Sequence, residues 1–194
     1  MESTVLERPL AVDPGREYSS ERNVLQFLRF FVGADTYAVR IELVREILEV
    51  TQMTPLPLMP AFVRGVMNLR GAVVPVVDLA ARLGFGGTEV GRRTCVVMVD
   101  LAVPDTDTDT GVRQSLGVLV DAVQEVFDAD EDSLESVPRM GTKIDPMFIQ
   151  NMVRVRGQVT PALDLEHTLA QKALSELIAQ YSAKGPSHVV ATTV

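Results

Sequence analysis

Hydrophobic and polar residues alternate along much of the chain, which is the pattern of half-buried β-strands. The alternation runs through residues 25–32 and resumes at 37–41 after a turn at Gly33, a spacing that predicts a β-hairpin. Residues 43–50 fit either a strand or a short helix, and we predict a strand because β-branched side chains lie nearby. The folded part of the chain is therefore expected to begin near Val24 with antiparallel strands.

A second hairpin is predicted between the apolar segments 65–69 and 73–77, with Gly71 in the turn because glycine tolerates a positive φ. Pro75 lacks a backbone N–H, so we expect it at a sheet edge or a bulge. The prolines of the preceding segment exclude regular structure until a short helix predicted at 60–62.

Further strands are predicted at 94–99 and 148–155, and the second is followed by a turn at Gly157. The segment 103–115 is rich in aspartate and threonine, and we predict a solvated loop. Its acids are spaced like the opening of a calcium-binding loop, but the glycine and the final glutamate of such a loop are missing. Apolar residues at helical spacing predict a C-terminal amphipathic helix that contains Leu165, Leu169, Ala173, Leu174, Leu177, Ile178 and Tyr181.

Two segments of the chain recur later in the same order, which indicates an internal duplication. Residues 65–79 align without a gap with residues 151–165, and an arginine, a glycine, a proline, an aspartate and a leucine coincide. Residues 37–47 align in the same way with residues 116–126. The chain is therefore predicted to be mainly β and to contain two similar subdomains.

The duplication determines the predicted domain organisation. We expect a flexible N-terminal tail at 1–23, one subdomain at about 24–90, a second at about 91–169, and a helix and tail at 170–194. Each subdomain is too small to bury all its apolar surface alone, so the two are expected to pack together.

Each predicted subdomain supplies a glutamate in one strand and an arginine at a hairpin turn. These are Glu46 and Arg70 in the first subdomain and Glu125 and Arg156 in the second. We predict that each glutamate forms an ion pair with its arginine and fixes the turn. Exposed pairs of this kind stabilise a fold by only ~0–1 kcal/mol, so a role in binding remains open.

The charge of the chain excludes some classes of partner. Lys and Arg number 18 against 26 Asp and Glu, and the resulting charge of -8 opposes nucleic-acid binding. No apolar run approaches the ~18 residues that cross a bilayer, and the first residues do not resemble a secretion signal. We therefore expect a cytoplasmic protein without direct membrane insertion.

Few residues could carry catalysis. The single cysteine, Cys95, lies in a predicted buried strand and cannot form an internal disulfide. A metal-dependent hydrolase that uses Asp78, Asp164 and His167 is one alternative, although no nucleophile has an adjacent base and no glycine-rich loop could hold a phosphate. A ligand-binding barrel is another alternative, and it would need a large enclosed pocket.

Several motifs resemble the CheW-like domains, the coupling-protein family of bacterial chemotaxis. The resemblance covers residues 24–169 and rests on residues 44–47, on the turn Gly-Val-Met-Asn-Leu-Arg-Gly at 65–71, and on Val-Pro-Val-Val-Asp-Leu at 74–79. A weaker repeat of the last motif closes the match at 163–165.

The resemblance implies two five-stranded SH3-like barrels packed around a hydrophobic core, with no cofactor and no catalysis. It also implies a scaffold that joins the cytoplasmic tips of chemoreceptors to the regulatory domain of the histidine kinase CheA. A receptor hairpin would lie in a groove between the barrels, and a kinase barrel would bind edge-on. An adaptor of a pilus or other non-flagellar chemosensory array is the alternative within the family.

By position, the resemblance places Val44, Glu46, Gly65 and Arg70 on the family's interaction surface. Each of these residues also has a structural interpretation. Val44 could belong to the core, Gly65 could serve only a bend, and Glu46 with Arg70 could be the ion pair described above.

Overall fold

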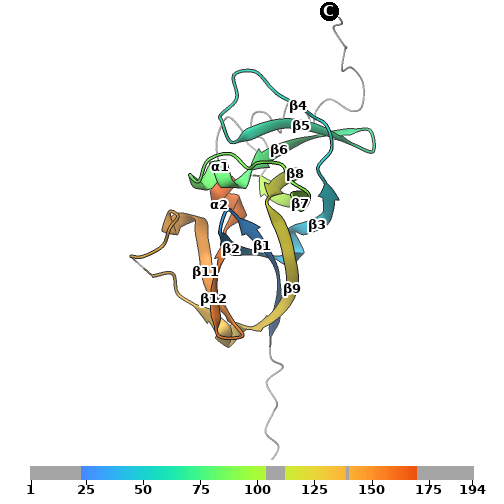
Figure 1. Ribbon diagram of the computed structural model, residues 1–194. Helices are drawn as coiled ribbons and strands as arrows, with labels where there is room; N and C mark the ends of the chain where they lie inside the picture. Colours follow the sequence, from blue (N-terminus) through green and yellow to red (C-terminus); the bar gives the residue numbers. More distant parts are fainter. Residues whose placement is uncertain (1–22, 104–111, 139, 170–194) are drawn as a thin grey trace, which may run out of the picture.

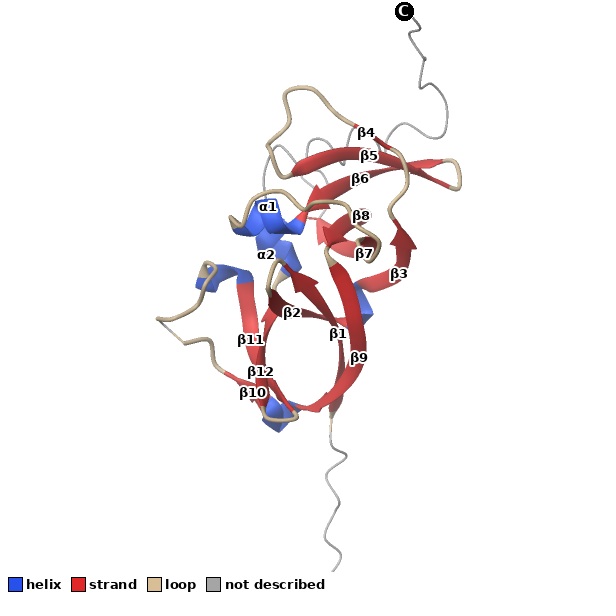
Figure 2. Ribbon diagram, in the orientation of Figure 1, coloured by secondary structure: helices blue, strands red, loops and turns tan. Residues whose placement is uncertain are grey.

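The computed structural model describes residues 23–103, 112–138 and 140–169, which form two six-stranded β-sheets with short helices (Figure 1, Figure 2). The first sheet has the order β10-β11-β12-β2-β1-β9, and the second has the order β3-β7-β8-β6-β5-β4. The strands are β1 (Val24–Val32), β2 (Asp35–Arg40), β3 (Val44–Glu49), β4 (Met53–Thr54), β5 (Val63–Leu69), β6 (Ala72–Asp78), β7 (Cys95–Val103), β8 (Val112–Val120), β9 (Ala122–Asp130), β10 (Leu134–Glu135), β11 (Ile149–Val155) and β12 (Gln158–Leu163). The helices are α1 (Leu79–Leu83), α2 (Leu165–Leu169) and the single 3-10 turns η1 (Ile41–Leu43), η2 (Glu131–Ser133) and η3 (Pro146–Phe148).

The mainly β fold class with short helices is confirmed, and the local strand predictions are largely correct. Both predicted hairpins are present, as β1–β2 and β5–β6, and the ambiguous segment 43–50 contains strand β3. The edge or bulge position expected for Pro75 is wrong, because β6 lies inside the sheet between β8 and β5 and Pro75 pairs with Val66. Pro75 immediately precedes Val76, where the parallel ladder to β8 begins. The missing N–H of the proline therefore falls outside that ladder.

Two further local predictions are wrong. The short helix expected at 60–62 is a single turn, closed by a hydrogen bond from the Val63 N–H to the Pro60 carbonyl, because β5 begins at Val63. The loop expected at 103–115 is too long, since β8 begins at Val112 and its first residues pair with the end of β7. Residues 104–111, most of the N-terminal tail and the segment 170–194 with its predicted helix lie outside the described residues.

The sheets do not follow the order of the duplicated segments along the chain. The hairpin β1–β2 joins β9–β12 in the first sheet, while the hairpin β7–β8 joins β3–β6 in the second. Each sheet therefore contains one hairpin from the other half of the chain. The division near residue 90 remains a prediction, and both sheets cross it.

Strand pairing in the two sheets nevertheless follows one register. The pairs Val44↔Val99, Glu46↔Met98 and Ile47↔Val97 of β3–β7 correspond to Val123↔Phe30, Glu125↔Arg29 and Val126↔Leu28 of β9–β1. Irregularities in the register fall at matching places in both ladders. The parallel pair Val76↔Gly117 of β6–β8 likewise corresponds to the parallel pair Ala162↔Ala38 of β12–β2. At these positions, the aligned segments of the sequence therefore have matching partners in the two sheets.

Buried side chains form one large cluster between the sheets and a smaller cluster within each sheet. The large cluster contains Phe30 and Val39 of the first sheet and Val97 and Val118 of the second. The cluster within the first sheet is centred on Phe27 and Phe127, which stack with their ring centroids 5.6 Å apart. The matching cluster in the second sheet is Met67, Val74, Val76, Val96, Met98 and Leu119.

The helices α1 and α2 lie at the junction of the two sheets (Figure 1). Arg82 of α1 donates a hydrogen bond to the carbonyl of Thr168 in α2. Its guanidinium lies 5.3 Å from the ring centre of Phe62 and 4.7 Å from that of Phe148. This contact links the elements that precede β5 and β11.

Candidate functional site

Arg70 lies at the tip of the β5–β6 hairpin in a strained turn. Its φ is 52° and that of Gly71 is 89°, so both central residues of the two-residue turn are in the left-handed region. Such a turn matches the twist of the flanking strands. The Asn68 side-chain carbonyl accepts a hydrogen bond of 2.9 Å from the Gly71 N–H and holds the turn closed.

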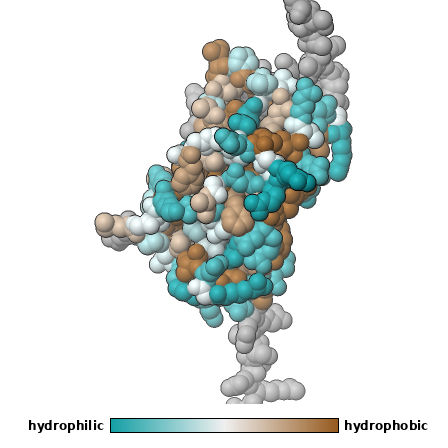
Figure 3. Space-filling model, viewed as in Figure 1, coloured by the Kyte–Doolittle hydropathy of each residue, from teal (hydrophilic) through white to brown (hydrophobic). Residues whose placement is uncertain are grey.

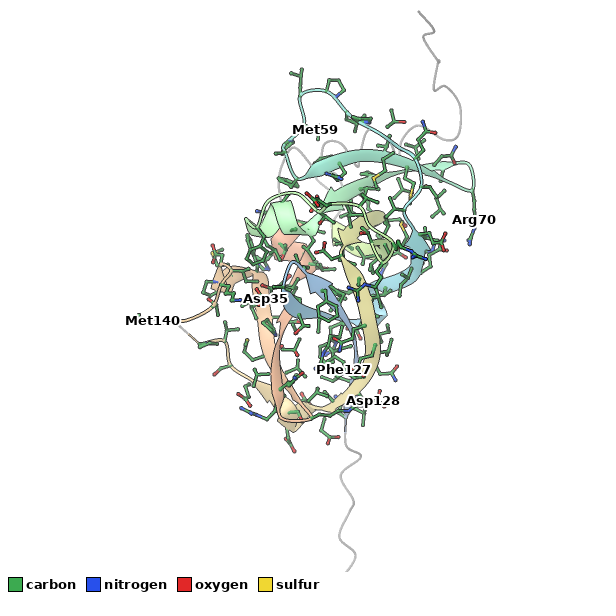
Figure 4. All side chains as sticks on the ribbon, viewed as in Figure 1. Asp35, Met59, Arg70, Phe127, Asp128 and Met140 are labelled. Atoms are coloured by element: carbon green, nitrogen blue, oxygen red, sulfur yellow. The ribbon has the colours of Figure 1, made fainter. Side chains whose placement is uncertain are left out.

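The turn places Arg70 against Glu46 of β3. The Arg70 Nη2 and Glu46 Oε2 atoms are 3.2 Å apart, with the arginine side chain 77% exposed and the glutamate 22%. Figure 4 shows Arg70 projecting from the hairpin tip on the side of β3. The pair therefore lies at the molecular surface, where solvent weakens it.

This ion pair shows that the second sheet is strongly curved. Strands β3 and β6 are three places apart in the sheet order, which in a flat sheet would separate them by about 14 Å. A direct contact between β3 and the end of β5–β6 requires the sheet to curl around its inner cluster. Within the described residues the sheet stays open, because its strand order ends at β3 and β4 and contains six strands.

Val44 and Gly65 are placed differently from Glu46 and Arg70. Val44 is half-buried at the start of β3, next to the register irregularity before Glu46, and it packs against the large cluster between the sheets. Gly65 is buried near the start of β5, against the backbone of Thr54 and Pro55. The structure thus joins Glu46 to Arg70 directly, keeps Val44 on the same strand, and sets Gly65 beneath the surface.

Strand β3 is an edge strand with an exposed apolar residue. Ile47 follows Glu46 along the strand, with its side chain on the opposite face and 44% exposed. Figure 3 shows hydrophobic and hydrophilic side chains interspersed on this side of the molecule. Arg45 donates to the Ser115 hydroxyl at 3.2 Å. An apolar residue within a polar surround is typical of a protein interface. Sequence reasoning missed Ile47, because alternation alone does not tell which face of an edge strand is covered.

The second predicted pair has the same geometry in the first sheet. Arg156 has a φ of 48° in the β11–β12 turn, and its Nη1 atom lies 3.5 Å from Glu125 Oε2 on β9. Glu125 has a further partner that the sequence did not indicate, the buried Arg29 of β1, whose Nη1 lies 3.2 Å from Oε1. A charged residue inside the apolar run of β1 was the available signal.

The residues of the hydrolase alternative have structural contacts. Asp78 is fully buried and caps α1 by accepting from the Ala81 N–H, and it also accepts from the N–H and hydroxyl of Thr88. Asp164 caps α2 in the same way through the His167 N–H. In the described ranges, no group of three or more His, Cys, Asp or Glu residues could hold a metal ion.

The pockets offer little for a ligand-binding alternative. One of about 420 Å³ is lined by Phe31, Thr36, Gln124, Gln158 and Val159, of which the last three are exposed. Another of about 250 Å³ lies beside Tyr37 and Ile144. The first pocket is a depression open to solvent rather than an enclosed cavity.

Two further findings concern Cys95 and the helices. Burial raises the pKa of the Cys95 thiol, which disfavours the reactive thiolate. Among the described helices, none combines the length and the apolar character that crossing a bilayer requires.

Comparisons with known proteins agree with this geometry. A family model described as the CheW-like domain matches residues 26–173. The chain is 30% identical over 141 residues to the chemotaxis protein CheW of Rhizobium meliloti (strain 1021), covering 73% of this chain and 84% of that protein. It is 29% identical over 154 residues to the chemotaxis protein CheW of Treponema pallidum (strain Nichols), covering 78% and 86%. The crystal structure of the scaffolding protein TtCheW from Thermoanaerobacter tengcongensis matches with a TM-score of 0.67 and 27% identity, over 77% of this chain and 94% of that one.

Proposed function

Because this chain belongs to the CheW-like domain family, we propose that it is a non-enzymatic scaffold that couples chemoreceptors to the histidine kinase CheA in chemosensory signalling. The observation that carries the proposal is the family match over residues 26–173, which includes both sheets. Relatives of similar length are chemotaxis proteins, and the matching crystal structure is that of a scaffolding protein. The partners are the cytoplasmic tips of the receptors and the regulatory domain of the kinase, so the scaffold works in the cytoplasm.

The curvature of the sheets supports the two SH3-like barrels of this proposal. In each sheet an ion pair connects a glutamate on an edge strand to an arginine on a distant hairpin turn. Each curved sheet also surrounds its own small apolar cluster. Two small units with separate inner clusters and one shared core would present two edges and a groove between them to partners.

The surface around Arg70 is one proposed contact with the kinase. Arg70 supplies an exposed charge that is paired with Glu46, and Ile47 supplies an exposed apolar side chain on the opposite face of the same edge strand. Arginine is enriched among the side chains that dominate binding energy at interfaces. Val44 contributes by fixing the start of β3, and Gly65 by allowing β5 to approach Thr54.

The test is binding of the CheA regulatory domain to the full chain by isothermal titration calorimetry. We predict that Arg70→Ala weakens binding at least about tenfold, or about 1.4 kcal/mol, because an arginine contact is lost. Its free energy of unfolding should change by less than about 1 kcal/mol, since the Glu46 pair is exposed. Arg154→Ala is the matched control, because Arg154 is also an exposed partner in an ion pair, with Glu135 on β10 at 2.6 Å.

Two outcomes would contradict the proposal. The first is absence of binding by the wild-type chain under conditions in which a known coupling protein binds the same domain. The second is an Arg70→Ala variant that folds and binds as well as the Arg154→Ala control, which would leave Arg70 with the structural role alone.

A further inference from the structure

Glu125 on the first sheet is shared by two arginines. The Arg29 Nη1 atom approaches Oε1 at 3.2 Å from inside the sheet, and the Arg156 Nη1 atom approaches Oε2 at 3.5 Å from the surface. Arg29 is 4% exposed, and its Nη2 donates to the Thr160 hydroxyl at 3.0 Å. Its guanidinium also lies 4.9 Å from the ring centre of Phe127. Arg29 is therefore fixed by contacts on several sides.

The matching position in the second sheet carries no charge. Glu46 pairs with Met98 along the β3–β7 ladder, as Glu125 pairs with Arg29 along β9–β1. Glu46 and Arg70 therefore neutralise each other, whereas Glu125 with Arg29 and Arg156 leaves one positive charge uncompensated. The two edges of this chain have the same backbone register but different charge.

The uncompensated charge is presented by Arg156. Its side chain is 80% exposed and that of Glu125 only 27%, while Arg29 is inside. The next acid along β9, Asp128, lies on the opposite face and accepts a hydrogen bond of 2.7 Å from Gln26. Figure 4 shows Phe127 pointing into the sheet and Asp128 pointing away from it. Arg156 thus has spare guanidinium donors beside an edge strand in an otherwise acidic segment.

We propose that Arg156 is a specificity-determining residue at the β9 edge, where it binds a carboxylate of an Asp or Glu side chain on the CheA regulatory domain. Arg29 is the positioning residue. It pairs with the Glu125 carboxylate from the interior of the sheet, so the Arg156 guanidinium can bind a carboxylate of the partner. The proposal rests on the proposed function for the identity of the partner. A guanidinium binds a carboxylate with two parallel hydrogen bonds, and this geometry makes the contact specific for a carboxylate in one orientation.

The first arm of the test measures the affinity of the full chain for the CheA regulatory domain at several salt concentrations. Arg156→Gln should weaken binding about tenfold and reduce its salt dependence, and Arg156→Glu should weaken it further. Both variants change a side chain that is 80% exposed, so they should unfold at the wild-type urea concentration. Lys143→Gln is the matched control, since Lys143 is an exposed cation that is paired with Asp35 at the start of β2.

The second arm separates positioning from direct contact. Arg29→Met installs the residue of the matching position in the second sheet, and Glu125 then competes with the partner for Arg156. Affinity should fall several-fold although Arg29 is buried. Adding Glu125→Gln to Arg29→Met removes the competitor, and affinity should recover; a purely structural role of Arg29 would not give this recovery.

The outcomes distinguish this inference from the proposed function. No binding by the wild-type chain would contradict the proposed function itself. Wild-type binding that Arg156→Gln and Arg156→Glu leave unchanged would overturn the inference while the function stands. A loss in Arg29→Met that Glu125→Gln does not reverse would remove the positioning role, and if Arg29→Met does not fold, the salt dependence of the two Arg156 variants decides.

Discussion

Gly65 occupies a position that only glycine can take without displacing the neighbouring backbone. Its φ is +136°, and a Cβ atom there would lie 2.2 Å from the carbonyl oxygen of Thr54 and 3.0 Å from Cα of Pro55. Backbone cannot move aside as the end of a flexible side chain can. A binding defect in a Gly65 variant would therefore follow from a folding defect.

We predict that Gly65→Ala lowers the free energy of unfolding by at least about 2 kcal/mol, from backbone strain and steric overlap together. Gly71→Ala is the matched control, because Gly71 also has a positive φ, +89°, but nothing lies within 4 Å of its Cβ position. That variant should lose only the ~1–2 kcal/mol of a left-handed alanine. Urea unfolding measures both, and equal losses would rule out a role for the approach to Thr54.

Tyr37 makes the fold sensitive to alkaline pH. Burial, with a smaller contribution from Asp35, raises the pKa of Tyr37 to about 12, against about 10 in an unfolded chain. The folded state holds this proton more tightly, so its contribution to stability is complete below about pH 10 and is lost as the pH rises toward about 12. We predict a fall of about 2 kcal/mol in the free energy of unfolding over this interval. Urea titrations across it should show a shallower fall for Tyr37→Phe, and identical slopes would contradict the assignment.

At the scale of single residues, the repeat made the two surface ion pairs predictable, but it could not predict the contact between Arg29 and Glu125. Glu46 with Arg70 and Glu125 with Arg156 stand at matching places in the aligned segments, so one pair implies the other. Arg29 has no charged counterpart in the repeat, because Met98 occupies the matching place. Arg29 contacts Glu125 only because β1 pairs with β9, and that pairing has to be known before the contact can be predicted.

At the scale of elements, matching strands of the two sheets carry side chains of different size at the same position. Ala38 of β2 pairs with Ala162 in the first sheet, and Gly117 of β8 pairs with Val76 in the second. A Cβ at Gly117 would lie 2.8 Å from Cγ1 of Val96 and 3.2 Å from Cγ2 of Val76. The smaller residue at Gly117 therefore compensates for the larger Val76, which stands where the first sheet has Ala162.

This balance predicts a coupling between Gly117 and Val96. Gly117→Ala should lower the free energy of unfolding by about 1–3 kcal/mol through overpacking. In a Val96→Ala background the closest methyl group is absent, so the same change should cost at least about 1 kcal/mol less. A double-mutant cycle measured by urea unfolding checks this. Losses that add within about 0.5 kcal/mol would show that the two side chains do not compete for space.

At the scale of the whole molecule, strand positions could be predicted and sheet membership could not. Alternation is a local property, and it located β1, β2, β3, β5 and β6. The ladder between β1 and β9 joins residues such as Phe27 and Phe127, which are far apart in the chain, and no local pattern specifies that choice. The repeat alone is equally compatible with each hairpin joining its own half. Pairing with the other half is what makes the two sheets interdependent.

We predict from this exchange that neither half of the chain folds alone. A fragment of residues 24–90 would hold β1–β2 without β9 and β3 without β7, and a fragment of 91–169 would have the reciprocal defect. Each would also expose the side chains that it contributes to the core between the sheets. Circular dichroism and urea titration should show no cooperative transition for either fragment, and one transition for an equimolar mixture, as for the intact chain. A cooperative transition in a single fragment would mean that its own hairpin had taken the place of the missing one. The exchange of hairpins between the halves would then not be required for folding.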